Sequence, residues 1–200
     1  MAQAKKQRRA EGPSPIARHV QRALREGALF VLLAVAAYLL IALATFNTAD
    51  PGWSHTGTGG RIDNAGGRFG AWFADVTLYL LGYVAYLLPL IVAWSAWLVF
   101  RGPTNEALGG ALRCHLIRWA GFVVTVLAAC GLASLHFAAI AETLPVGAEA
   151  GGVLGTMLGD QVVRVLGMLG GTLLLLALFL AGATLATGLS WFDVMDWLGA

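Results

Sequence analysis

The sequence predicts an all-α membrane protein in which four transmembrane helices cross the bilayer and both termini are cytoplasmic. First, 58% of the 200 residues are hydrophobic and only 12% are charged, whereas a soluble domain carries about 25% charged residues. Second, four apolar runs approach the length of about 20 residues that a helix needs to cross a hydrocarbon core of about 30 Å. Third, lysine and arginine concentrate before the first run, which predicts a cytoplasmic amino terminus. The expected spans lie at about 27–46, 76–100, 116–135 and 165–187.

Residues 1–26 are expected to form a basic cytoplasmic tail that ends in a short amphipathic helix. Ser14 suits an N-cap and Pro15 suits the first helical position, so we expect this helix to lie on the inner membrane face. The basic charges could hold nucleic acid, but beside a span we interpret them as a topology signal attracted to anionic lipid headgroups. They are Lys5, Lys6, Arg8, Arg9, Arg18, Arg22 and Arg25.

The first span is predicted at 27–46, which contains no charged residue. A cleavable signal peptide is the competing interpretation, because Ala42-Leu43-Ala44 resembles a cleavage site. The apolar region of a signal peptide is about 7–15 residues long, however, and this run is longer. We therefore expect the segment to remain as a span.

The second span is predicted within 76–100, after a helical lead-in that begins near Phe69. Pro89 removes a backbone hydrogen bond and is expected to kink this helix. Tyr79, Tyr83 and Tyr86 recur at helical spacing and should share one face. A cofactor or substrate stripe is one interpretation of that face, and packing against a neighbouring helix is the one that we favour.

The remaining charges assign the other connections to sides of the membrane. Arg101, Arg113 and Arg118 surround the loop before the third span at 116–135, which predicts a cytoplasmic loop. The segment 136–160 carries acidic residues and no lysine or arginine, so we expect it outside. After the fourth span at 165–187, residues 190–200 should begin a cytoplasmic linker.

The stretch "DPGWSHTG" and the glycine-rich residues after it are expected to connect the first two spans outside the membrane. A phosphate-binding loop would need a lysine beside its glycines, and the only lysines in the chain are Lys5 and Lys6. His55 has no second histidine at the spacing of a metal site. Asp50, Pro51 and Gly52 are expected to turn the chain, and Trp53 can anchor at the outer membrane interface.

No catalytic, cofactor-binding or metal-binding pattern is found along the sequence. The apolar runs contain hydroxyl side chains but almost no ionisable ones, and an intramembrane proton or ion pathway would need the latter. The two cysteines have neither a CxxC spacing nor a nearby pair of histidines. We therefore expect this segment not to be an enzyme and to need no cofactor.

Small residues near the fourth span predict close helix packing. Glycine recurs at every fourth position in two places, which lets helix backbones approach each other closely. Packing within one chain and assembly of several copies are both compatible with the pattern. The residues are Gly151, Gly155, Gly159, Gly167 and Gly171.

Several segments together resemble the amino-terminal four-helix membrane domain of the FtsK/SpoIIIE family of bacterial DNA translocases. They are "DPGWSHTG", "NAGGRFGAWFAD" leading into "LYLLGYVAYLLPL", "AACGLASL", "GGVLG" and "TGLSWFDVMDWLG". The resemblance extends over about 27–199, which is most of the chain.

The resemblance implies a membrane anchor and assembly domain that acts at the division septum of the bacterial inner membrane. It implies contacts with the lipid bilayer, other division proteins and further copies of the chain, and with DNA only through a motor domain that these residues do not contain. It also implies a docking role for the outer-loop residues Asp50, Pro51, Gly52, Trp53 and His55. The end at Ala200 is interpreted as a truncation before a linker. The alternative from another functional class is a small four-helix transporter or channel.

Overall fold

The computed structural model describes residues 15–57, 60–101, 108–139, 144–188 and 195–196, and all its regular elements over these residues are helices. Four apolar stretches are long enough to cross a membrane, so the predicted all-α class with four spans is confirmed. The elements are α1 (Pro15–Ala44), α2 (Gly67–Leu81), the 3-10 helix η1 (Gly82–Tyr86), α3 (Leu87–Arg101), α4 (Leu108–His136) and α5 (Gly152–Thr187).

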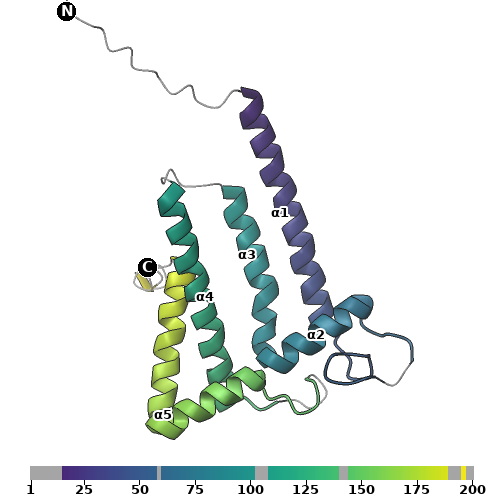
Figure 1. Cartoon of the computed structure of the whole chain (residues 1–200), viewed down its shortest axis with the longest axis vertical. Helices are drawn as coiled ribbons and strands as arrows, with labels where there is room; N and C mark the ends of the chain where they lie inside the picture. Colours follow the sequence, from purple (N-terminus) through teal and green to yellow (C-terminus); the bar gives the residue numbers. More distant parts are fainter. Residues whose placement is uncertain (1–14, 58–59, 102–107, 140–143, 189–194, 197–200) are drawn as a thin grey trace, which may run out of the picture.

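The long helices form two pairs, in which α1 packs against α3 and α4 packs against α5 (Figure 1). The α4–α5 pair has the most extensive contact in the molecule. The two pairs meet mainly through α2, η1 and α5 at one end of the molecule. Because little contact joins α3 directly to α4, the two pairs depend on that end for their relative placement.

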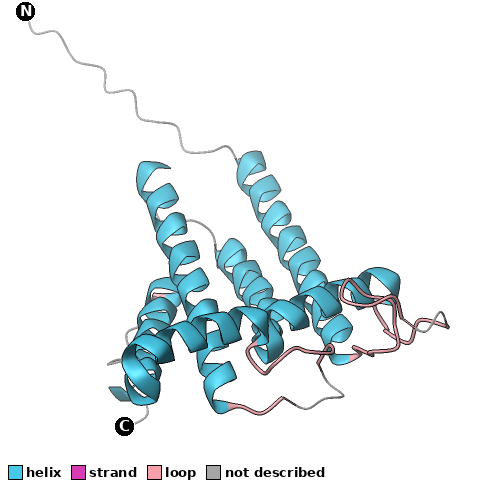
Figure 2. Ribbon diagram, turned by 60° about the horizontal axis from the view of Figure 1, so that its bottom comes forward, coloured by secondary structure: helices cyan, strands magenta, loops and turns pink. Residues whose placement is uncertain are grey.

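Two helical segments lie across the same end of the long helices (Figures 1 and 2). One is α2, and the other is the first part of α5, residues 152–166. Each joins its membrane-crossing continuation at a glycine with positive φ, which is 58° at Gly82 and 71° at Gly167. Such angles suit only glycine without strain. We call α2, η1, residues 152–166 and the loop 45–66 the platform.

The predicted second span at 76–100 is therefore not one straight helix. The chain runs along α2 to Leu81, turns through η1 and continues as α3 from Leu87. The predicted break near Pro89 falls at η1, directly before α3, of which Pro89 is the third residue. A proline at this position cannot donate to the carbonyl four residues earlier, that of Ala85 in η1. The positive φ of Gly82 ends α2.

The other expected spans agree with the helices in position. The first, 27–46, runs two residues past the end of α1 at Ala44, the third lies within α4, and the fourth, 165–187, begins two residues before the bend of α5 at Gly167. The predicted amphipathic helix is present as the start of α1, but it continues into the span without a break. The remainder of the tail, 1–14, and most of 190–200 lie outside the described residues.

Two apolar clusters connect the platform to the long helices. In the first, Leu43 of α1 meets Leu78 of α2, Ala85 of η1 and Leu144. In the second, Val84 of η1 packs with Val126 and Cys130 of α4, and Ala133 completes it. Thus η1 contributes to both clusters and lies between the two pairs.

Substitution of Gly82 by alanine should destabilise the fold more than the same substitution at Gly67. Both glycines have positive φ, 58° and 65° respectively, so each alanine carries a conformational cost of about 1–3 kcal/mol. Only at Gly82 would the added Cβ overlap the Ala150 carbonyl and the Gly152 nitrogen, whereas nothing lies within 4 Å of the Cβ position at Gly67. We expect a further loss of about 1–3 kcal/mol at Gly82. Unfolding of both variants in detergent measures the difference, and equal losses would contradict the close contact.

Candidate functional site

The loop 45–66 is held by three buried polar side chains. Among the described residues the buried polar or charged ones are Asp50, Asn64 and Asp75, with exposed fractions of 3%, 4% and 1%. All three belong to the platform. Buried polar groups are unfavourable unless they are hydrogen-bonded, so their partners determine what the loop can do.

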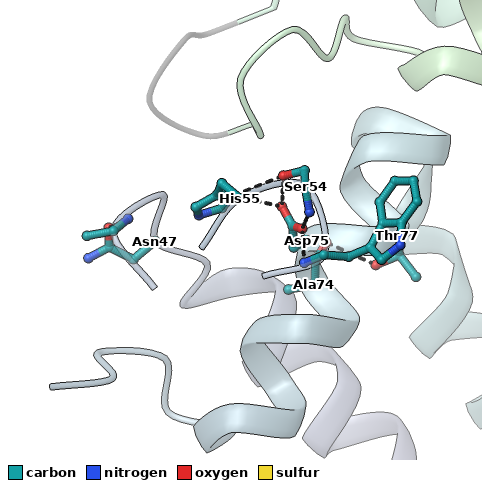
Figure 3. A network of polar contacts seen from close by, with 8 residues as sticks. Asn47, Ser54, His55, Ala74, Asp75 and Thr77 are labelled. Atoms are coloured by element: carbon teal, nitrogen blue, oxygen red, sulfur yellow. Dashed lines mark hydrogen bonds and ion pairs between the residues drawn. The ribbon is translucent and has the colours of Figure 1, made fainter. Parts of the chain in front are cut away.

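Asp75 extends from α2 into the first part of the loop (Figure 3). Its Oδ2 accepts hydrogen bonds from the backbone N–H groups of Trp53 and Ser54, both at 2.6 Å. Its Oδ1 accepts a bond from the Ser54 hydroxyl at 2.7 Å. A Cβ at Gly52 would lie 2.5 Å from the Asp75 carboxyl carbon, so only glycine lets the backbone come this close. The carboxylate thus fixes the turn at 52–55 against α2.

Asp50 organises the second part of the loop in the same way. Its two oxygens accept bonds from the backbone N–H groups of Asp63 and Asn64, each at 2.8 Å. The side-chain amide of Asn64 then donates to the carbonyls of Ala42 at 2.8 Å and Thr45 at 3.1 Å. These carbonyls belong to the carboxyl-terminal end of α1, where helical partners are lacking. The loop is therefore attached to α1 as well as to α2.

Further bonds strengthen the attachment to α1. The Tyr38 hydroxyl donates to the Gly66 carbonyl at 2.7 Å, and the Ala65 N–H donates to the Thr45 hydroxyl at 3.0 Å. The Gly66 N–H donates to the Asn64 side-chain oxygen at 2.8 Å. This last bond turns the chain into the start of α2. The loop is a folded unit, with both ends bonded to helices.

The five residues predicted for docking divide into internal and outward-facing ones. The Asp50 carboxylate and the Gly52 backbone are used inside the loop, and Pro51 and His55 are half-buried. Trp53 is 60% exposed, and its ring makes an edge contact with Tyr79 at 5.7 Å between centroids. Docking by these residues stays a prediction, and Trp53 is the one whose side chain presents a large surface.

Ser54, His55 and Asp75 lie together, but they do not form a hydrolytic relay. In such a relay the carboxylate and the serine bind opposite nitrogens of the histidine ring. Here His55 Nδ1 is 2.9 Å from the Ser54 hydroxyl and 3.6 Å from Asp75, so both neighbours face the same nitrogen. The serine hydroxyl also donates directly to the carboxylate. The arrangement holds a turn rather than activating a nucleophile, and no group of potential metal ligands occurs among the described residues.

The first set of predicted glycines packs within the chain. A Cβ at Gly151 or Gly155 would overlap the Cys130 carbonyl of α4, and one at Gly159 would lie 3.0 Å from the Ser134 hydroxyl. These glycines therefore let the first part of α5 cross α4 at backbone distance. The packing interpretation applies to all three.

Gly167 and Gly171 have a different role from the one their spacing indicated. Gly167 is the bend of α5, and nothing lies within 4 Å of its Cβ position. The nearest atoms to a Cβ at Gly171 belong to Val162 and Val163 of the same helix, across the bend. Gly167 and Gly171 therefore shape the bend of α5. Contact with a second copy through it is not tested by these observations.

The three tyrosines are divided by the end of α2. Tyr79 lies in α2, whereas Tyr83 and Tyr86 lie in η1, so they do not share one continuous helical face. Tyr83 and Tyr86 pack against the first apolar cluster. The Tyr86 hydroxyl donates to the Leu43 carbonyl of α1 at 3.1 Å, which agrees with packing against a neighbouring helix.

Sequence reasoning missed Asp75, Asn64 and a second close crossing of α4 and α5. At that crossing a Cβ on Gly121 would lie 2.7 Å from the Ala186 nitrogen, and one on Gly182 would lie 2.8 Å from the Gly121 carbonyl oxygen. Asp75 was detectable, because it is an ionisable residue within an apolar segment. Asn64 and the glycine crossing carry no local signal, since their partners are distant in the sequence.

Comparison with known proteins identifies relatives over nearly the whole chain. A family model described as the 4TM region of DNA translocase FtsK/SpoIIIE matches residues 21–199. A DNA translocase FtsK of Pseudomonas syringae pv. syringae is 45% identical over 88% of this chain and 22% of its own length. One from Vibrio vulnificus is 39% identical over 88% of this chain and 17% of its own length. DNA translocase FtsK 2 of Ralstonia nicotianae is 36% identical over 94% of this chain and 24% of its own length.

These relatives are several times longer than the region that they share with this chain, which spans 17–24% of their length. No solved structure matches the chain.

Replacement of Asp75 by asparagine should loosen the loop. A neutral amide oxygen accepts weaker bonds from the Trp53 and Ser54 N–H groups than a carboxylate does, at a cost of about 1–3 kcal/mol. Faster tryptic cleavage after the exposed Arg61 is the expected result. Asp63→Asn is the matched control, because Asp63 is exposed and its carboxylate accepts only a 3.3 Å bond from Asn47. Equal cleavage rates in the two variants would contradict the role of Asp75.

Proposed function

Because the chain belongs to the family of the four-transmembrane region of the DNA translocases FtsK and SpoIIIE, we propose that it anchors and assembles such a translocase at the division septum. In this proposal the chain is a multi-pass domain of the bacterial inner membrane and takes part in cell division and chromosome segregation. DNA translocation itself belongs to other parts of a longer protein, since the relatives extend well beyond the shared region.

The observation that carries the docking part of the proposal is the rigid presentation of Trp53. The Asp75 carboxylate holds the Trp53 backbone against α2, while the side chain is 60% exposed and braced by the Tyr79 ring. Exposed tryptophans on a preformed scaffold are frequent energetic centres of protein interfaces. We infer that a septal partner binds the platform at this residue.

The distribution of charge supports an outward-facing platform. Of the 13 lysine and arginine residues, only Arg61, Arg68 and Arg164 belong to the platform, whereas Arg22, Arg25 and Arg101 lie on the ends of α1 and α3 that point away from it. Positive residues near spans are enriched on the cytoplasmic side. The proposal therefore puts the platform on the outer side of the inner membrane. It puts both termini of the domain on the cytoplasmic side, where a motor and DNA would be found.

Assembly of several copies side by side in the membrane is part of the proposal, as the resemblance to the family implies.

The transporter alternative has less support. A transport pathway needs polar groups along the spans, whereas the three buried polar residues of the described chain all serve the loop.

Thiol labelling in intact cells tests the proposed orientation. With both native cysteines replaced, a membrane-impermeant reagent should modify a cysteine at the exposed positions Ala65 and Val146 and should spare one at Asn105, between α3 and α4. Labelling after cell lysis is the control that Asn105 can react. Modification of the Asn105 position alone in intact cells would reverse the orientation.

Localisation of a fluorescent fusion tests the proposed septal role. The unaltered chain should concentrate at the division site, and Trp53→Ala should reduce this enrichment towards an even membrane distribution, since truncation of a central interface tryptophan costs about 2 kcal/mol or more. Trp94→Ala is the matched control, because Trp94 is 43% exposed on α3, away from the loop. An even distribution of the unaltered chain over the membrane would contradict septal recruitment. Equal enrichment of the Trp53→Ala and Trp94→Ala variants at the division site would show that Trp53 is not the main contact with the septal partner.

A further inference from the structure

The outward side of α2 carries an apolar stripe formed by Phe69, Trp72, Val76 and Leu80. Their spacing of three or four residues puts all four on one helical face. Phe69, Trp72 and Leu80 are 63%, 47% and 36% exposed, and Val76 is half-buried. The residues that α2 buries against the rest of the protein are on the opposite face: Gly70, Ala71, Ala74 and Leu78.

We propose that α2 lies flat in the membrane interface at the platform end, with this stripe bound to lipid at the boundary between headgroups and acyl chains. The stripe then holds the platform at a fixed depth. This inference concerns only the position of the helix in the bilayer, so it does not rest on the septal role.

The lengths of the helical segments support a position of α2 at the boundary between headgroups and acyl chains. The apolar stretch Gly67–Arg101 has 35 residues, which is far more than the roughly 20 that one crossing requires. Of these, α3 spans about 22 Å at 1.5 Å per residue, which is too short to cross a hydrocarbon core of about 30 Å. The five residues of η1, through which the chain turns, add at most about 10 Å at 2.0 Å per residue. Together α3 and η1 therefore reach no more than about one core thickness, which leaves α2 at or near the edge of the hydrocarbon.

The fourth span gives the same depth independently. The part of α5 after its bend at Gly167, residues 168–187, is about 30 Å long at 1.5 Å per residue. Its bend is therefore also one hydrocarbon thickness from the far end of the helix. Both helical breaks thus fall at the level of one interface, and both segments beyond them lie across that end of the molecule (Figure 2).

The chemistry of the stripe favours lipid over water or protein. Tryptophan and phenylalanine on an amphipathic helix are typical of segments that lie in the interface plane. Arg68 is exposed at the start of α2, where a guanidinium can meet lipid phosphate. The first part of α5 differs, since its exposed residues mix the polar Asp160, Gln161 and Arg164 with the apolar Met157 and Val165. Of the two segments, α2 thus presents the more uniformly apolar face.

Spin labels on the two segments test the proposal. In the chain with both cysteines replaced and reconstituted in nanodiscs, single nitroxides are attached at Trp72→Cys, Leu80→Cys and, as the matched control, Gln161→Cys. Relaxation by oxygen, which dissolves in lipid, is compared with relaxation by a water-soluble nickel complex. We expect high oxygen and low nickel accessibility at Trp72 and Leu80, and the reverse at Gln161.

Two results would overturn the proposal. Nickel accessibility at Trp72 and Leu80 equal to that at Gln161 would show that the stripe faces water. Low accessibility to both reagents would show that protein, such as a second copy of the chain, covers it.

A second measurement avoids labels that disturb folding. Tryptophan quenching by lipids brominated near the headgroup end of the acyl chain is compared between the unaltered chain and Trp72→Phe. The difference between the two chains gives the fluorescence of Trp72 alone. Lipids brominated near the headgroup end should quench this fluorescence more strongly than lipids brominated near the terminus of the acyl chain. Equal or absent quenching would overturn the interfacial position.

Discussion

The backbone contact between the end of α2 and the start of α5 is the constraint on which the rest of the structure depends. The Tyr83 N–H donates to the Ala150 carbonyl at 2.8 Å, and Gly82 and Gly152 approach so closely that neither could carry a Cβ. Unpaired backbone groups are expensive where water is scarce, so a non-helical joint needs such partners. This joint lets the chain leave the plane of α2 as α3, and it connects the α1–α3 pair with the α4–α5 pair.

The loop 45–66 is fixed in turn to the helices that this contact positions. Asp75 binds its first part to α2, and Asn64 binds its second part to the end of α1. Charge-assisted bonds from a carboxylate to backbone N–H groups are stronger than neutral ones, and the low polarity around Asp75 strengthens them further. A loop fixed to two helices loses less conformational entropy when a partner binds than a free one would. The same bonds that fold the loop therefore prepare Trp53 for contact.

Composition and charge predicted the class and the four spans, because the length of an apolar run reports hydrocarbon thickness directly. They did not predict the platform, because an apolar helix in the interface and one crossing the bilayer have similar composition. The break at Gly82 depends on a φ angle that the residue type permits but does not require. In the candidate site, Trp53 was identified from the sequence, whereas Asn64 was not, since its bonds reach 19 and 22 residues back to Thr45 and Ala42. The regular spacing of Gly167 and Gly171 did not reveal that α5 bends at Gly167.

The packing of α4 against α5 determines how the domain resists mechanical load. Gly121 and Gly182 bring the two backbones together near the end of α5, and Leu175 lies on Gly131 farther along. A pull on the chain beyond Thr187, directed along α5, would slide this interface parallel to its length. All contacts along the interface then resist together, as in shear, whereas a sideways pull would open them one after another, as in peeling. The α4–α5 interface would therefore resist a pull along the axis of α5 better than a pull across it.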